Sequence, residues 1–332
     1  MVAIPNSLLT AAGIFKHWAA DRLLQLQEEK KILEPLYHYT DASGLKGIVE
    51  SQQIWFTSHR YLNDPSELIL GIDAAQEAIA IVKAERSARV KVFCDILANL
   101  FNIGNITKSL EYLVASFSRE RDDLGQWRAY GCNGHGFALG LASHLFRVEE
   151  QKPDQKPNEV TVVYPIEYGR NRARERHYEV VTKAADIFED TVNKHEDLMQ
   201  NRAVGIAFIE NYAMEVFADV MIFTCLTSKH EAYAHEREVR LMMLGLHTKL
   251  KPYIETRIKN GGLVAFVKHA MPIKEPGSIV EVVVGPSAGV DTEHAVRSLL
   301  NSAGIGPTVP IRHSDIPYRA RRPVVTDRAM EA

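Results

Sequence analysis

The sequence feature that most restricts the fold is a unit of strand, helix and strand near the N-terminus. Residues 36–58, LYHYTDASGLKGIVESQQIWFTS, begin and end with short runs of apolar and aromatic residues. Such runs are typical of strands, and Asp41 or Ser43 can cap a short helix between them. A chain with this unit has to form a sheet that carries helices.

The rest of the chain alternates between the same two kinds of pattern. Apolar residues recur every three or four positions over about 7–32, after Pro65, over 88–101 and over about 171–220, which predicts helices. Strands are predicted in VTVVYPIEY, MIFTCLTSK, REVRLMML, SIVEVVVGPSAG and TVPIRHSDIPYR. We therefore expect an N-terminal helix within 1–35 and a single α+β domain over 36–332, with a helical insertion at about 171–220.

The composition describes an ordinary globular protein. A formal net charge of -3 over 332 residues gives no long-range attraction to nucleic acid or an anionic membrane. Cys94, Cys132 and Cys225 are far apart and lack C-x-x-C spacing, as in a reduced cytosolic protein. The chain shows neither a signal peptide nor an apolar stretch of membrane-spanning length. We expect a cytoplasmic protein with no membrane partner.

Two motifs raise the possibility of metal or serine chemistry. His230 and His235 are five positions apart, about 140° around a helix, unlike the stacked pair of H-E-x-x-H, so no metal is predicted. Gly285, Ser287 and Gly289 match the G-x-S-x-G pattern of a nucleophile elbow. Little chain follows Ser287 to supply the partner carboxylate and histidine. The G-x-S-x-G match therefore has two interpretations: a serine hydrolase that uses Ser287, or a simple turn that ends a strand.

Three predicted strands carry polar residues at positions that can face a site. In HEREVR, Glu236 and Glu238 would share one face of a strand, which either lines a site or borders water. In VASFS, Ser116 and Ser118 share a face and can bond a ligand or a neighbouring carboxylate, or end the strand. His38 in LYHYT is either a core residue bonded to a carbonyl or a catalytic group.

Several motifs occur in order along about residues 36–319: LYHYT, IWFTS, YLNDPSE, VASFS, DDLGQWRAYG, GHGFALG, CLTSK, HEREVRL, VVVGP and SDIPYR. In this combination they resemble a bacterial family defined as a domain of unknown function, DUF2971. The resemblance implies that the motifs belong together. It implies no activity, because the family name carries none.

A looser resemblance supplies chemistry. A strand histidine before Tyr-Thr, then Ser-x-Ser and Glu-x-Glu strands, looks like the NAD-dependent ADP-ribosyltransferases, including the branch of RNA 2′-phosphotransferases and DNA-modifying toxins. It implies a split, mostly antiparallel sheet flanked by helices, with NAD as substrate. By this resemblance His38 binds ribose hydroxyls, Tyr39 or Tyr61 stacks on nicotinamide, and Glu238 stabilises the oxocarbenium ion. Glu236 would be the acceptor-side carboxylate.

The expected function is therefore an ADP-ribosyltransferase or NAD glycohydrolase, acting on nucleic acid or protein as a bacterial toxin or phage-defence effector. A fixed carboxylate sheltered from water suits the positive charge that develops on ribose. The alternative is a sensor module that binds a nucleotide without cleaving it. Further ligand-binding candidates are Thr40, Ser58, Asn63, Asp64, Ser116, Ser118, Trp127 and Arg240. Asn63 and Asp64 can equally cap a helix, and Trp127 can equally belong to the core.

Overall fold

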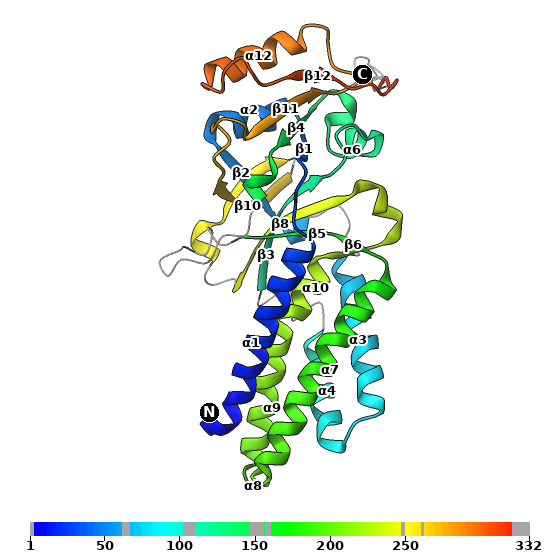
Figure 1. Ribbon diagram of the computed structural model, residues 1–332, viewed down its shortest axis with the longest axis vertical. Coiled ribbons are helices and arrows are strands. Elements are labelled where there is room, and N and C mark those ends of the chain that lie inside the picture. Colours follow the sequence, from blue (N-terminus) through cyan, green and yellow to red (C-terminus); the bar gives the residue numbers. More distant parts are fainter. Residues whose placement is uncertain are drawn as a thin grey trace, which may run out of the picture. The chain divides into compact units, whose positions relative to one another are not determined.

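The computed structural model describes residues 3–61, 67–101, 110–146, 156, 161–246, 250–259 and 262–320. The chain folds into two compact units (Figure 1). Unit 1 contains Met1–Lys31, Trp55–Ser116 and Arg147–His269, and unit 2 contains Ile32–Ile54, Phe117–Phe146 and Ala270–Ala332. Compact units need not fold separately, so the single domain expected over 36–332 stays a prediction.

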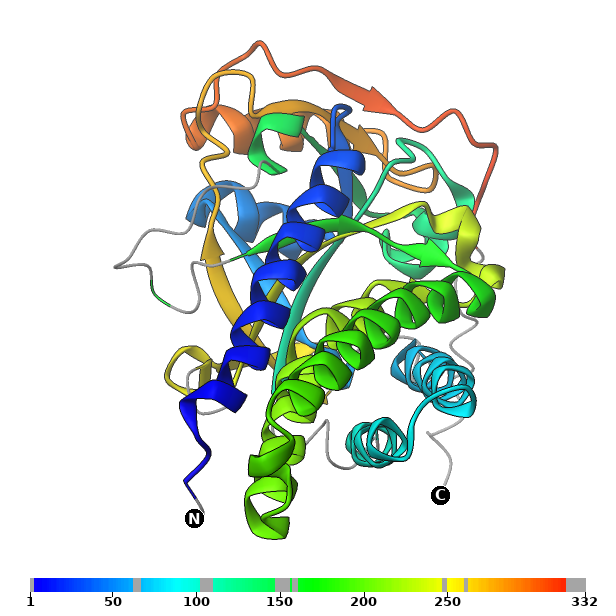
Figure 2. The same cartoon turned by 60° about the horizontal axis from the view of Figure 1, so that its bottom comes forward.

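Unit 1 is built largely from helices. They are α1 (Asn6–Glu29), α3 (Glu67–Ala84), α4 (Ala88–Leu100), α7 (Arg170–Lys194), α8 (Glu196–Met199), α9 (Arg202–Val216) and α10 (Ile222–Leu226). Figures 1 and 2 show α3, α4, α7 and α9 packed side by side. Aromatic rings fill the space between them: the Phe188 ring centroid lies 5.1 Å from that of Phe93 and 5.7 Å from that of Phe208. The helices expected around 7–32 and 171–220 are present.

One predicted strand of unit 1 is a helix. MIFTCLTSK was expected to be extended, but Ile222–Leu226 forms α10 after the π-helix Phe217–Met221, and only Ser228–Lys229 is a strand. Every residue of α10 is buried, so the run lacks the exposed positions that would distinguish a helix from a strand. A Cβ atom on Gly71 of α3 would lie 2.5 Å from Cys225 Cα. Glycine therefore permits close helix packing, which decides the conformation.

The strands of unit 1 form antiparallel pairs. β5 (Val162–Pro165) pairs with β8 (Glu238–Leu246), β9 (Glu255–Lys259) with β10 (Gly262–Ala270), and β2 (Gln53–Ser58) with β3 (Leu110–Ser118). β8 also pairs with β3. A separate parallel pair joins β6 (Glu167–Tyr168) to β7 (Ser228–Lys229). This pair holds the chain just before β8 and so positions the charged residues described below.

Unit 2 is a sheet with short helices. Its strands run in the order β12 (Ile311–His313), β11 (Ile279–Val284), β4 (Phe137–Leu141) and β1 (Leu36–Thr40). All neighbours are antiparallel except β11 and β12. The helices are α2 (Ala42–Ser51), α6 (Leu124–Ala129) and α12 (Thr292–Ser302). Asp41 caps α2 by accepting a bond from Gly44 N at 2.7 Å, one of the two caps that the sequence predicts.

The α+β class is confirmed, with a sheet that is mostly antiparallel. The finer likeness to an ADP-ribosyltransferase sheet stays a prediction. Among the residues described, no helix combines the length and apolarity needed to cross a lipid bilayer.

Candidate functional site

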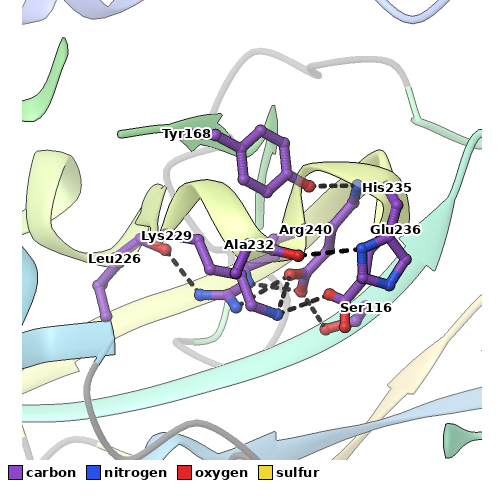
Figure 3. Close-up of polar contacts among 9 residues, drawn as sticks. Ser116, Tyr168, Leu226, Lys229, Ala232, His235, Glu236 and Arg240 are labelled. Atoms are coloured by element: carbon purple, nitrogen blue, oxygen red, sulfur yellow. Dashed lines mark hydrogen bonds and ion pairs between the residues drawn. The ribbon is translucent and has the colours of Figure 1, made fainter. Parts of the chain in front are cut away.

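Four charged side chains are buried together in unit 1 (Figure 3). Lys229 comes from β7, Glu236 from the end of the 3-10 helix Glu231–Glu236, and Glu238 and Arg240 from the start of β8. Arg240 is 1% exposed and Glu238 is 6% exposed. We call these four residues the charged cluster. Two acids and two bases make it neutral as a whole.

Glu238 is the centre of the charged cluster. Its Oε1 accepts hydrogen bonds from Ser116 Oγ and from Arg240 Nε, both at 2.7 Å. Its Oε2 accepts bonds from Lys229 Nζ and Arg240 Nη2, both at 3.1 Å. The Arg240 contact is thus a bidentate fork, the strongest geometry for this pair. The carboxylate is fully occupied by donors.

Glu236 joins the cluster in a way that the sequence did not predict. The two glutamates were expected on one strand face, but the strand begins at Glu238 and Arg237 has the left-handed backbone value φ 44°. Lys229 Nζ bridges the two acids, at 2.7 Å from Glu236 Oε2 and 3.1 Å from Glu238 Oε2. The predicted shared strand face is therefore wrong, although the side chains do meet.

Two backbone groups next to the charged cluster are also hydrogen-bonded to side chains. The N–H of Glu238 donates to Tyr168 Oη at 2.9 Å, and Arg240 Nη1 donates to the carbonyl of Leu226 at 2.9 Å. Burial raises the pKa of Tyr168 to about 12, so the phenol stays neutral. Tyr168 and Leu226 flank β7, the strand of Lys229. The charged cluster is therefore fixed to β6 through Tyr168 and to the end of α10 through Leu226.

The cluster keeps Glu238 ionised. Burial by itself raises the pKa of this carboxyl, but Arg240, Lys229 and the hydrogen bonds outweigh burial and lower the pKa to about 2. A perturbed acid beside a specific charge partner is typical of functional sites and also of structural ion networks. The arrangement can supply a fixed negative charge, but not a proton, near neutral pH.

Of the predicted ligand-binding residues, Tyr39 and Trp127 lie in the core of unit 2. Trp127 is fully buried and packs edge-on against Tyr39 with ring centroids 4.8 Å apart. Its Nε1 donates to Asp122 Oδ1 at 2.6 Å, and Tyr39 Oη donates to the carbonyl of Glu120. The ring faces are covered, so a role in stacking on nicotinamide is not supported. Trp127 is a core residue, which was the alternative to ligand binding that the sequence left open.

Of the remaining unit 2 candidates, His38 and Thr40 are half-buried and Ser118 is buried. His38 is half-buried on β1, with its ring centroid 5.5 Å from that of Phe117. Thr40 ends the same strand, and Ser118 Oγ accepts from the N–H of Glu120 at 3.0 Å. Ser118 and His38 thus belong to unit 2, whereas Ser116 and Glu238 belong to unit 1.

The other predicted residues of unit 1 lie at the end of β2. Ser58 is buried, and Tyr61, in the short helix His59–Tyr61, is 43% exposed. Tyr61 therefore keeps an accessible ring, unlike Tyr39. Asn63 and Asp64 lie outside the described residues.

Ser287 does not have the surroundings of a catalytic serine. Its Oγ accepts from Ala320 N at 2.9 Å and donates to the carbonyl of Tyr318 at 3.3 Å. Its N–H donates to the carbonyl of Gly134 at 2.8 Å. In the described parts of the chain both Oγ bonds go to backbone groups, so no base activates it. The G-x-S-x-G match marks a turn.

A second polar group, in unit 2, was missed by the sequence reasoning. Glu281 on β11 is buried and bonded to Tyr37, Arg121 and Arg312. The available signal was an acid inside the apolar run SIVEVVV, which needs a buried partner. For metals, the described ranges bring no three His, Cys, Asp or Glu side chains together.

Comparison with known proteins yields one match. No curated protein and no solved structure matches the chain. The resemblance predicted from the motifs covers about residues 36–319, and the family match covers the middle of that range. The range matched by the family model includes all four residues of the charged cluster. The predicted resemblance is confirmed over this part of the chain: residues 126–241, from α6 into β8, match the model of the family described as "Protein of unknown function (DUF2971)".

Proposed function

We propose that this protein is an NAD-dependent ADP-ribosyltransferase or NAD glycohydrolase in which Glu238 supplies the negative charge. The observation that carries the proposal is the bond from Ser116 Oγ to Glu238 Oε1 at 2.7 Å. It joins the Ser-x-Ser and Glu-x-Glu segments, the two motifs on which the resemblance to these enzymes depends. Their contact supports the proposal, because it brings these two motifs together.

The physical chemistry of the charged cluster supports the same proposal. Buried ion pairs are a poor means of stabilising a fold, since apolar residues of similar size often do as well or better. Four buried charges therefore suggest a role beyond stability. In the reaction, nicotinamide leaves with the electron pair of its bond to ribose C1′. Water or an acceptor hydroxyl or amine then bonds C1′ and releases its proton, while an ionised carboxylate offsets the positive charge on the ribose.

A second candidate function has an observation of its own. Each oxygen of Glu238 already accepts two bonds, and Lys229 and Arg240 offset its charge. A saturated, neutralised carboxylate holds its surroundings rigid more readily than it stabilises a cation. This favours the alternative of a module that binds a nucleotide without cleaving it.

One experiment separates the two functions. Purified protein is incubated with NAD and a bacterial lysate as source of acceptors, and nicotinamide release is measured. The transferase proposal expects release by the wild type and its loss in Glu238→Gln, with the exposed Glu255→Gln as the matched control. Intact NAD, together with a raised melting temperature in the presence of nucleotides, would instead establish the binding module. Growth arrest on expression, abolished by Glu238→Gln, tests the toxin or phage-defence role.

A further inference from the structure

Unit 2 contains an open cleft that the proposed function does not use. It has a volume of about 510 Å³, within the range of small-molecule sites. The cleft is lined by Arg121, Val280, Glu281, Pro310, Arg312 and Asp315. These residues come from the segment after β3, from β11 and from the region of β12 (Figure 1). Four of the six side chains are charged.

A cross-strand arrangement positions Glu281 at the cleft. Tyr37, Gly140 and Glu281 lie opposite one another across β1, β4 and β11. A Cβ atom on Gly140 would lie 2.9 Å from Tyr37 Cε1, so glycine leaves room for the tyrosine ring. Tyr37 Oη then donates to Glu281 Oε1 at 2.9 Å. The register of β11 shifts between Ile279 and Glu281, and irregularities of this kind redirect side chains.

Glu281 in turn holds two arginines. Arg121 Nε donates to its Oε1 at 3.0 Å, and Arg312 Nε lies 3.3 Å from its Oε2. In both cases the contact uses Nε, and within the described residues the Nη groups make no further bond. The Arg121 side chain is 34% exposed and that of Arg312 is 61% exposed. The carboxylate thus orients two guanidinium groups while leaving their outer N–H donors accessible.

We propose that this cleft binds a sugar phosphate through Arg121 and Arg312, with Asp315 accepting bonds from the sugar hydroxyls. Planar guanidinium groups match the oxygens of a phosphate better than any other side chain does. Asp315 is exposed and would repel a bare anion, but an acidic side chain is a common partner of ribose hydroxyls. The lining therefore suits a ligand that has a phosphate at one end and hydroxyl donors at the other.

Calorimetry on the full chain tests the proposal with three probes: ribose 5-phosphate, inorganic phosphate and ribose. Ribose 5-phosphate should bind more tightly than either of the others. Arg312→Ala should weaken its binding about tenfold, the loss expected for one charge-assisted bond. Arg319→Ala, which removes an exposed arginine of the same unit, is the matched control and should not change the affinity. Equal affinities for all three probes, or full affinity in Arg312→Ala, would overturn the proposal.

Asp315→Asn provides a second reading that does not depend on the arginines. This substitution should weaken the binding of ribose 5-phosphate. Inorganic phosphate should bind as tightly as before or more tightly, because the repulsive charge is removed. If both ligands lost affinity equally, the hydroxyl contact would be excluded. The proposal does not rest on NAD cleavage, so its failure and that of the proposed function are separate results.

Discussion

Each unit contains a buried glutamate on a strand that holds guanidinium groups, and the two arrangements differ in what they leave free. In unit 1, Arg240 donates two hydrogen bonds to Glu238 of the same strand, and the whole charged cluster is buried. In unit 2, Glu281 holds Arg121 and Arg312 from other segments by Nε alone, at the edge of an open cleft. The same pair of groups therefore makes a closed network in one case and a surface for a ligand in the other.

The difference lies in the geometry of the pairs. Arg240, two residues along the strand from Glu238, meets its carboxylate with two donors. Arg121 and Arg312 each meet Glu281 at Nε, so their remaining donors stay available. Stability should therefore depend strongly on the first arrangement and weakly on the second.

The largest difference should follow from removing the arginine in each unit. Arg240→Ala leaves a buried carboxylate with Lys229 and Ser116 as its partners, so the free energy of unfolding should fall by roughly 3–5 kcal/mol. Urea unfolding followed by circular dichroism measures this loss, with Arg319→Ala as a control that should match the wild type. A loss below about 1 kcal/mol would mean that the charged cluster is no tighter than a surface pair.

The second largest effect on stability should come from acid, which acts on the charged cluster. Because the pKa of Glu238 is lowered to about 2 from the model-peptide value of 4.5, its contribution to stability is complete above pH 4.5 and is lost as the pH falls towards 2. The loss should be about 3 kcal/mol. Unfolding measured from pH 6 to pH 2 should show this slope in the wild type and a shallower one in Glu238→Gln. Identical slopes would assign acid sensitivity to other carboxyls.

A smaller effect is expected from the hydroxyl that links the two motifs. Ser116→Ala removes one bond to a charged acceptor, so the free energy of unfolding should fall by about 1.5–3 kcal/mol. Ser118→Ala removes a bond from the N–H of Glu120, a neutral donor, and should cost less. Urea unfolding of both variants tests the order. If Ser118→Ala were the more damaging, the importance assigned to the Ser116 contact would be lost.

The smallest effect on stability should come from unit 2. Arg312 is largely exposed, so Arg312→Ala should lower the free energy of unfolding by less than about 1 kcal/mol, and salt should reduce the difference further. Thermal melting at low and high ionic strength provides the measurement. A large, salt-independent loss would show that the two units use their glutamates in the same way.

Much of the fold could be predicted because it depends on local patterns. The helices of unit 1, the strand containing His38 and the cap by Asp41 follow from residue spacing and short-range hydrogen bonding. The exception, α10, is a run with no exposed position, where periodicity carries no information. Its conformation depends on packing against Gly71, which lies far away in the sequence.

The candidate site was predictable in part. Glu238 and Ser116 were singled out as polar residues on strands, and they do meet. Lys229 was not predicted, since nothing near it in the sequence marks a lysine that is buried between two acids. Glu281 was also missed, although an acid in an apolar strand is a signal that a buried partner exists.

The sequence by itself determined most of the helices and strands, α10 excepted, because apolar spacing, caps and side-chain shape act within a few residues. The tertiary structure decided which charges meet and which donors remain open, because Coulomb attraction and desolvation depend on distances between residues far apart in the chain. Glu238 stands in the charged segment HEREVR and Glu281 in the apolar run SIVEVVV, and neither context says whether the acid is enclosed. Only the folded chain encloses one and leaves the other beside a cleft.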